Sequence, residues 1–82
     1  MAVVDVTIVP VGTASASLSD YVAGCLAVLQ EAEGIHWQLT PMSTVIEGDL
    51  EQVLAVIRKM HEQPFSKGAG RVVTTICIDD RR

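Results

Sequence analysis

The spacing of apolar residues changes along the chain, and this change limits the possible folds more than any other feature of the sequence. Strict alternation of apolar and polar residues is typical of a half-buried strand, whereas apolar residues three and four positions apart indicate an amphipathic helix. Alternation occurs over residues 3–9, 36–40, 44–48 and 71–79, and helical spacing occurs from Ser17 to Gly34 and again after Asp49. The sequence therefore predicts the order strand, helix, strand, strand, helix, strand.

Residues that start or stop regular structure lie between these segments. Pro10 is expected to end the first strand, because proline supplies no backbone N–H to a sheet. Ser17, in the stretch SLSD, and Asp49 are suitable N-terminal caps for the two helices. Gly34 is a natural stop for the first helix, and Pro64 is expected to end the second helix or to tighten its last turn.

Each predicted helix has one apolar stripe that would face a core. In the first helix the stripe consists of Leu18, Val22, Cys25, Leu29 and Ala32, with Tyr21 and Val28 widening it. In the second helix it consists of Leu50, Val53, Leu54, Ile57 and Met60.

This order of elements predicts an α+β protein with a ferredoxin-like βαββαβ sandwich. Short connections and right-handed crossovers give a four-stranded antiparallel sheet in the order 4-1-3-2, with both helices on one face. We expect residues 1–82 to form a single domain of this kind. The other face of the sheet would then stay uncovered.

The uncovered face is expected to mix Val and Thr with carboxylates. If Val4, Val6 and Ile8 face the helices, Asp5 and Glu47 lie at the centre of the uncovered face, because the first and third strands are the central pair. The full set is Asp5, Thr7, Val9, His36, Gln38, Thr40, Val45, Glu47, Val73, Thr75 and Cys77. A slip of one residue would move the set of the second or fourth strand to the other face. A half-apolar face of this kind is most simply an oligomer interface.

Glu47, which closes the β-branched stretch TVIE, has two explanations. In the first, it is a partly wet carboxylate at the end of a strand and has no special purpose. In the second, an interface removes it from water, and it then needs a cationic or hydrogen-bonding partner such as a ligand. The residues alone leave both explanations open.

Size and charge exclude several classes of function. Six Lys and Arg against ten Asp and Glu give a net charge of −4, and the basic residues are scattered, so we expect no nucleic-acid partner. No apolar run approaches the roughly 20 residues of a membrane span, so we expect a cytoplasmic protein that does not enter membranes. Cys25 and Cys77 lack any metal-binding spacing and are expected to be reduced. A chain of 82 residues has a thin core, which association would support.

Several stretches together resemble a known family. The stretches VPVGT, SLSDYV, LTPMSTVIEGDLEQVL, KMHEQPFSKGAGRV and ICIDDRR are similar, in order and spacing, to the small thiamine-binding proteins, which are single ferredoxin-like domains that bind thiamine or hydroxymethylpyrimidine. The resemblance covers nearly the whole chain. It implies a homo-oligomer, commonly a tetramer, that holds thiamine or its pyrimidine moiety at a subunit interface.

The resemblance also implies ligand-binding residues, which are Gly12, Thr13, Ser17, Tyr21, Ser43, Thr44 and Glu47. An aminopyrimidine has a ring nitrogen and an exocyclic amine that a carboxylate and hydroxyl groups can pair with. Ser17 and Gly12 also have structural explanations, as a helix cap and a turn residue, and Tyr21 and Trp37 can equally fill the core or stack on a ring. His61, near a helix end, is expected to favour the helix dipole. The final run Asp79 to Arg82 is expected to be solvated or paired between subunits.

Three function classes follow. The first is a binding protein that takes thiamine or hydroxymethylpyrimidine as ligand, without a cofactor, a metal or turnover. The second is an enzyme, which would need a nucleophile with a base or a metal set, and the chain has only His36, His61, two cysteines in apolar contexts and dispersed carboxylates. The third is a structural or regulatory oligomer with no small-molecule ligand. The first is the leading prediction.

Overall fold

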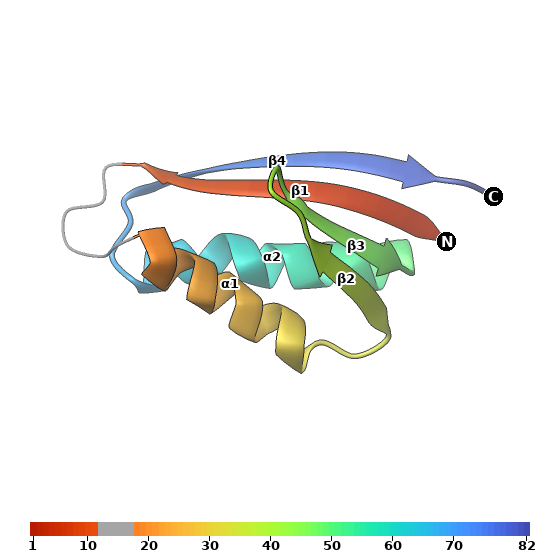
Figure 1. The fold of residues 1–82 in the computed structure, drawn as a ribbon, viewed down its shortest axis with the longest axis horizontal. Coiled ribbons are helices and arrows are strands. Elements are labelled where there is room, and N and C mark those ends of the chain that lie inside the picture. Colours follow the sequence, from red (N-terminus) through yellow and green to blue (C-terminus); the bar gives the residue numbers. More distant parts are fainter. Residues whose placement is uncertain (12–17) are drawn as a thin grey trace.

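The chain folds into the predicted order of elements in the computed structural model, which describes residues 1–11 and 18–82 (Figure 1). The strands are β1 (Ala2–Val11), β2 (Ile35–Leu39), β3 (Thr44–Gly48) and β4 (Arg71–Asp80), and the helices are α1 (Leu18–Glu31) and α2 (Leu50–Ser66). In the described residues the strands form one sheet in the order β2-β3-β1-β4, and all neighbouring strands are antiparallel. The prediction of a ferredoxin-like fold is confirmed.

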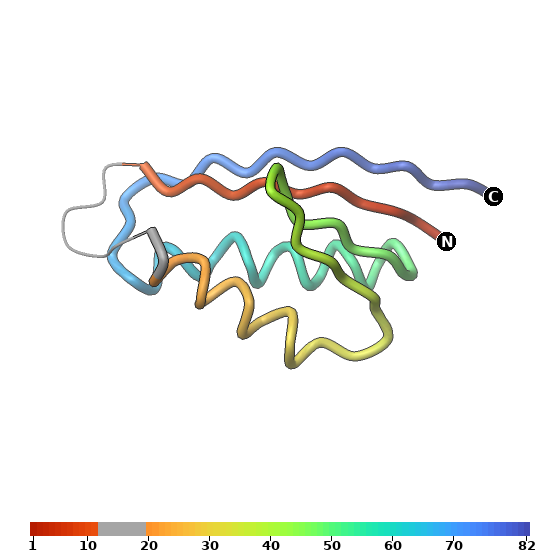
Figure 2. Tube along the Cα trace, viewed as in Figure 1, coloured from red at the N-terminus to blue at the C-terminus, as the bar shows by residue number. Residues whose placement is uncertain are grey.

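Both helices lie on the same face of the sheet, and the two ends of the chain lie close together at one end of β1 and β4 (Figures 1 and 2). The two long strands, β1 and β4, are paired along their whole length, from Ala2 opposite Asp80 to Val11 opposite Arg71. In contrast, β3 pairs with β1 only as far as Val6. The sheet therefore has a wide end near the chain termini and a two-stranded end beyond Val6.

The core lies between the helices and the inner face of the sheet. Val4 and Val6 of β1 and Ile46 of β3 alternate with exposed neighbours, as a strand with one buried face requires. The buried apolar cluster consists of Ala2, Val4, Val6, Leu29, Ile46, Val53, Val56, Ile57 and Met60. Trp37 packs against this cluster from the inner face of β2, so it fills the core and is no stacking platform on the uncovered face.

The predicted helix stripes are wrong at their flanks. Leu54 of α2 is 38% exposed, and Val56 is buried in its place. Val22 of α1 is 47% exposed, whereas Tyr21 is only 3% exposed. Successive residues on a helix differ by about 100° in direction, so Val22 lies about 100° from Tyr21, and Val56 lies about 160° from Leu54. Only the position of the sheet decides which residue of each pair becomes buried.

The first strand is longer than predicted, because it continues through Pro10 to Val11. Proline cannot donate to a ladder, and it is found in strands that have one unpaired edge. Beyond Val6, β1 keeps only β4 as a neighbour, so Pro10 lies where the β3 side of the strand has no partner. The expectation that Pro10 ends the strand is therefore wrong.

Two residues of α2 differ from their predicted roles. Asp49 occupies the N-cap position, but its side chain makes no capping hydrogen bond in the described structure. His61 does not act at the helix end, since its Nδ1 lies 2.6 Å from Oγ1 of Thr74 and so links α2 to β4. Its ring also meets Phe65 edge to face, with 5.6 Å between the ring centroids.

Pro64 does not end α2, which continues to Ser66, but its last turn is tightened, as the other predicted role requires. The Lys67 N–H donates to the Pro64 carbonyl and the Gly68 N–H donates to the Phe65 carbonyl, each three residues back. Proline leaves the carbonyl four residues earlier without its helical donor, and here that carbonyl belongs to Met60. The thiol of Cys25, on α1, lies 3.6 Å from the Met60 oxygen and donates to it. The packing of α1 on α2 thus supplies a donor that the helix itself lacks.

Candidate functional site

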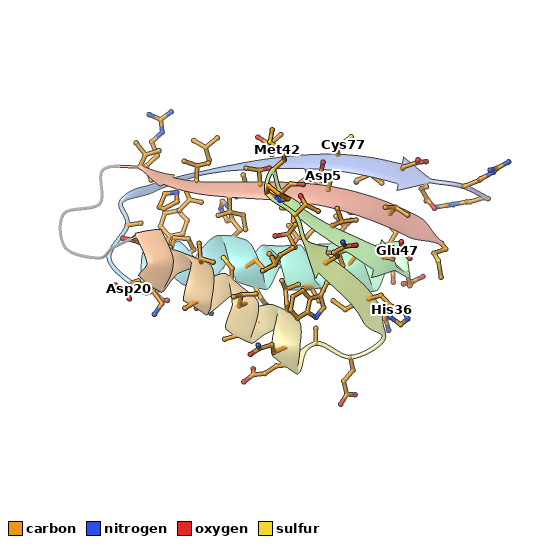
Figure 3. All side chains as sticks on the ribbon, in the orientation of Figure 1. Asp5, Asp20, His36, Met42, Glu47 and Cys77 are labelled. Atoms are coloured by element: carbon orange, nitrogen blue, oxygen red, sulfur yellow. The ribbon has the colours of Figure 1, made fainter. Side chains whose placement is uncertain are left out.

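The uncovered face of the sheet carries the side chains that the alternation predicts. Direct opposition in an antiparallel sheet puts two residues on the same face. Asp5 is opposite Val45 and Cys77, and Val3 is opposite Glu47 and Asp79. Figure 3 shows Asp5 and Cys77 together on the two long strands. The predicted inward and outward sets are therefore confirmed within the strands.

Glu47 lies near the end of β3 and is exposed. Its neighbours across the sheet are Val3 on β1 and His36 on β2. In Figure 3, Glu47 and His36 lie on the same part of the sheet, away from Met42 at the tip of the β2–β3 hairpin. In the single chain, this carboxylate is in contact with water. Only a surface packed against the sheet would remove it from water.

The β2–β3 hairpin holds Ser43 and Thr44 in place through Thr40. The Thr40 Oγ1 donates to the Ser43 carbonyl at 2.9 Å and accepts from the backbone N–H groups of Met42 at 3.3 Å and Ser43 at 3.0 Å. The Thr40 N–H donates to the same Ser43 carbonyl at 2.8 Å. Sequence reasoning assigned Thr40 to the uncovered face and missed this role. A hydroxyl residue directly before a proline turn is the signal that could have indicated it.

A pocket of about 100 Å³ lies between α1 and the inner face of the sheet. Tyr21 and Thr44 both line it, together with apolar side chains such as Ile8, Leu29 and Met60. Cys25 lines it too, and burial raises the pKa of the Cys25 thiol because the thiolate would lose its hydration. The pocket is therefore apolar, with a hydroxyl at Thr44 and a protonated thiol on its wall.

The predicted ligand-binding residues fall into separate groups in the described structure. Tyr21 and Thr44 border the pocket on the helix side of the sheet, and Glu47 lies on the opposite, uncovered face. Ser43 is half-buried in the hairpin next to Thr44. Gly12, Thr13 and Ser17 lie outside the described residues.

Other features constrain the chemistry of the surface. Cys25 and Cys77 are both free thiols. Within residues 1–11 and 18–82, no group of three or more His, Cys, Asp or Glu side chains could hold a metal ion. In the same ranges neither helix has the length and apolar character to cross a membrane. At the C-terminal end, Arg82 pairs with Asp80 of the same chain at 2.9 Å.

Known proteins resemble this chain in sequence and in fold. A family model described as thiamine-binding protein matches residues 4–82. The UPF0045 protein YqgV of Bacillus subtilis is 55% identical over 85 aligned residues, which cover 100% of this chain and 82% of that protein.

Two solved structures have the same fold. The hypothetical protein MJ1052 of Methanocaldococcus jannaschii superposes with a TM-score of 0.83 at 32% identity, over 99% of this chain and 80% of that one. A Bacillus cereus domain of unknown function, DUF77, superposes with a TM-score of 0.89 at 25% identity, over 98% of this chain and 75% of that one. By sequence and by fold, the chain belongs to the thiamine-binding protein family.

Proposed function

We propose that the chain binds thiamine or its hydroxymethylpyrimidine moiety, without turning it over, at an interface between copies in a cytoplasmic homo-oligomer, a tetramer. The observation that carries this proposal is the exposed carboxylate of Glu47 on a sheet face that neither helix covers. Membership of the thiamine-binding protein family supports the choice of ligand.

The surroundings of Glu47 suit a cationic or amine-bearing ligand once the face is covered. Val3 beside the carboxylate is 39% exposed, so a second surface packed there would bury apolar area and exclude water. A carboxylate without water needs a partner, and the exocyclic amine of an aminopyrimidine or the fixed charge of a thiazolium would satisfy it. His36 on the other side adds a further polar group that can donate or accept a hydrogen bond.

The volume of the pocket on the helix side of the sheet can be compared with the size of the ligand. An apolar cavity of roughly 150 Å³ holds one benzene ring. The pocket is smaller, at about 100 Å³, so a pyrimidine ring beside Tyr21 and the Thr44 hydroxyl would require side chains of the pocket wall to move. Both rings of thiamine would require more movement still.

The pocket and the surface around Glu47 cannot bind the same small molecule within a single chain. Thr44 and Glu47 are three residues apart on β3, so their side chains leave the sheet on opposite faces and are separated by about 10 Å along the strand. A ligand that contacts Glu47 and the Tyr21 group together would therefore need them from different subunits. This supports an interface site over a site within one protomer.

Calorimetric titration and thermal unfolding with thiamine, and separately with hydroxymethylpyrimidine, test the proposal. Bound ligand should stabilise the fold by about 2.7 kcal/mol at a hundredfold excess over Kd. Glu47→Gln should remove most of this shift, because the amide lacks the charge that attracts the ligand, while native mass spectrometry shows the same oligomer as the parent. Thr44→Val tests the pocket separately.

The matched control is Glu51→Gln, which neutralises an exposed carboxylate in the first turn of α2. It should bind as the parent does. Equal affinity of the Glu47→Gln and parent chains would refute a ligand role for Glu47, and no binding of either compound by the parent would refute the proposed function. Mass spectrometry of the recovered ligand checks that it is unchanged, since a converted product would indicate an enzyme.

The alternative is a structural or regulatory oligomer with no small-molecule ligand. The observation in its favour is that valines on the uncovered face are exposed, Val9 by 47% and Val73 by 43%. Burial of these valines would by itself stabilise the stacking of two sheets. This alternative predicts the same oligomer with no shift for either compound.

A further inference from the structure

Asp5 and Glu47 are diagonal neighbours on the uncovered face, across the two central strands. Glu47 of β3 is opposite Val3 of β1, and Asp5 of β1 is opposite Val45 of β3. Because alternate residues of a strand share a face, these four side chains form one patch, with carboxylates at two opposite corners and valines at the other two. Diagonal neighbours in an antiparallel pair lie about 7–8 Å apart. One small ligand can therefore contact both carboxylates of this central patch.

The side chains of the central patch are available to a ligand in the single chain. Asp5 and Glu47 are exposed, Val3 is 39% exposed, and Val45 is half-buried. In the described structure neither carboxylate forms an ion pair. The central patch thus combines two unpaired negative charges with apolar surface.

The charges around the central patch are negative as well. Arg71 is the one Lys or Arg in the described strands, and it is opposite Val11. Val11 is six positions from Asp5 along β1, which is about 20 Å. Exposed charges that far apart are largely screened at physiological salt, where the Debye length is about 8 Å. The basic residues 81–82 follow the end of β4, whereas Asp79 is opposite Val3 and adds a third carboxylate beside the patch.

The proposed function requires the uncovered face to be covered, which would take both carboxylates of the central patch out of water. A desolvated carboxylate needs a cation or hydrogen-bond donors, and two carboxylates so close together also repel each other. Neutral hydroxymethylpyrimidine can donate to one carboxylate but brings no positive charge. Thiamine brings the same amine and, one methylene carbon away, a thiazolium ring with a fixed positive charge. Only thiamine offers a partner to both carboxylates.

The two carboxylates have different neighbours. His36, opposite Glu47 on β2, can donate or accept a hydrogen bond, as the ring nitrogen and the amine of a pyrimidine require. Asp5 lies between Val45 and Cys77, which offer little hydrogen bonding. The thiazolium nitrogen is alkylated and has no hydrogen to donate, so it needs only a negative charge beside apolar surface. This difference favours the pyrimidine at Glu47 and the thiazolium at Asp5.

We propose that Asp5 is a specificity-determining residue of the binding site, whose carboxylate pairs with the thiazolium of thiamine and repels the phosphate of its esters. The hydroxyethyl group that carries the phosphate belongs to the thiazolium ring, so a phosphate would lie near Asp5. The site then selects the unphosphorylated cation over both the neutral pyrimidine and the phosphate esters. This inference rests on the proposed function, because it needs the face to be covered and Glu47 to bind the ligand.

Calorimetric titration of the assembled protein with three compounds tests the role of Asp5. The parent should bind thiamine about tenfold or more tightly than hydroxymethylpyrimidine, and about tenfold or more tightly than thiamine monophosphate, which are differences that one charge-assisted contact can supply. Asp5→Asn keeps the size of the side chain and removes its charge. It should weaken thiamine binding by about tenfold and change the affinity for hydroxymethylpyrimidine by less than about twofold. The preference for thiamine over its monophosphate should fall to about threefold or less, because the repulsion is gone.

Two further variants separate this effect from a general change in the site. Glu47→Gln should weaken thiamine and hydroxymethylpyrimidine together, because both contain the pyrimidine. Glu62→Gln removes an exposed carboxylate from α2, in the other layer of the fold, and is the matched control that should leave all three affinities unchanged. Native mass spectrometry should show the parental oligomer for each variant.

The inference and the proposed function fail in different ways. Equal loss of affinity for thiamine and hydroxymethylpyrimidine in Asp5→Asn, or no loss for either, would overturn the role of Asp5. A parent chain that binds hydroxymethylpyrimidine or thiamine monophosphate as tightly as thiamine would also overturn it, although the proposed function would stand. A parent chain that binds neither thiamine nor hydroxymethylpyrimidine would refute the proposed function, and this inference with it.

Discussion

The contact between Cys25 and the Met60 carbonyl predicts an energetic coupling between Cys25 and Pro64. Pro64 has no N–H for the Met60 carbonyl, and the Cys25 thiol donates to that oxygen at 3.6 Å. A neutral hydrogen bond contributes about 0.5–1.5 kcal/mol, and a thiol, as a weak donor, belongs at the lower end. With about 0.5–1 kcal/mol for the lost apolar contact of the sulfur, Cys25→Ala should cost about 1–2 kcal/mol of unfolding free energy.

Pro64→Ala restores a backbone N–H that can satisfy the same carbonyl. In that background the thiol donor is redundant, so Cys25→Ala should cost about 0.5–1 kcal/mol less than in the parent. Urea unfolding of the parent, the two single variants and the double variant measures this difference as a double-mutant cycle. The effect of proline on the unfolded chain occurs on both sides of the cycle and cancels.

Cys25→Ser is the control for packing, because serine is smaller than cysteine but keeps a donor. Its coupling with Pro64→Ala should be smaller than that of Cys25→Ala. Additivity of Cys25→Ala and Pro64→Ala within about 0.3 kcal/mol would refute the hydrogen-bond argument. If Cys25→Ser and Cys25→Ala couple equally to Pro64→Ala, the coupling between Cys25 and Pro64 comes from the cavity volume that they share and not from the hydrogen bond of the thiol.

Four further outcomes are expected from the core, a turn and the two thiols. Ile46→Ala, at a fully buried position, should lower the unfolding free energy by about 2–5 kcal/mol in urea titration, and a loss below 1 kcal/mol would contradict the assigned core. Gly34→Ala should destabilise by about 1–2 kcal/mol because Gly34 has a φ of +78°, whereas Gly70→Ala, which meets no atom within 4 Å, should change the melting temperature little. Exposed Cys77 should react with an alkylating reagent much faster than half-buried Cys25 at neutral pH, as followed by mass spectrometry. Burial raises the pKa of the Cys25 thiol above its ordinary value of 9.0, so the folded state keeps the full stability that the protonated thiol gives it below about pH 9.0 and loses it as the pH rises through the folded pKa.

The element order and the two faces of the central strands could be predicted because they depend on local periodicity. Val4, Val6 and Ile46 alternate with polar or exposed neighbours, and only one face of such a strand can be buried. The ends and flanks could not be predicted in this way. Whether Pro10 is tolerated depends on where β3 stops pairing with β1. Whether Leu54 or Val56 is buried depends on the direction from which α2 meets the sheet.

The candidate site was predictable in part for the same reason. The alternation of β3 indicated that Glu47 belongs to the uncovered face, and it is exposed there. Tyr21 on α1 and Thr44 on β3 line the same pocket, although they are more than twenty positions apart in the sequence. No local sequence pattern can predict that two such distant residues lie around one pocket. The link between Cys25 and Met60 is of the same kind, since it depends on how α1 packs on α2.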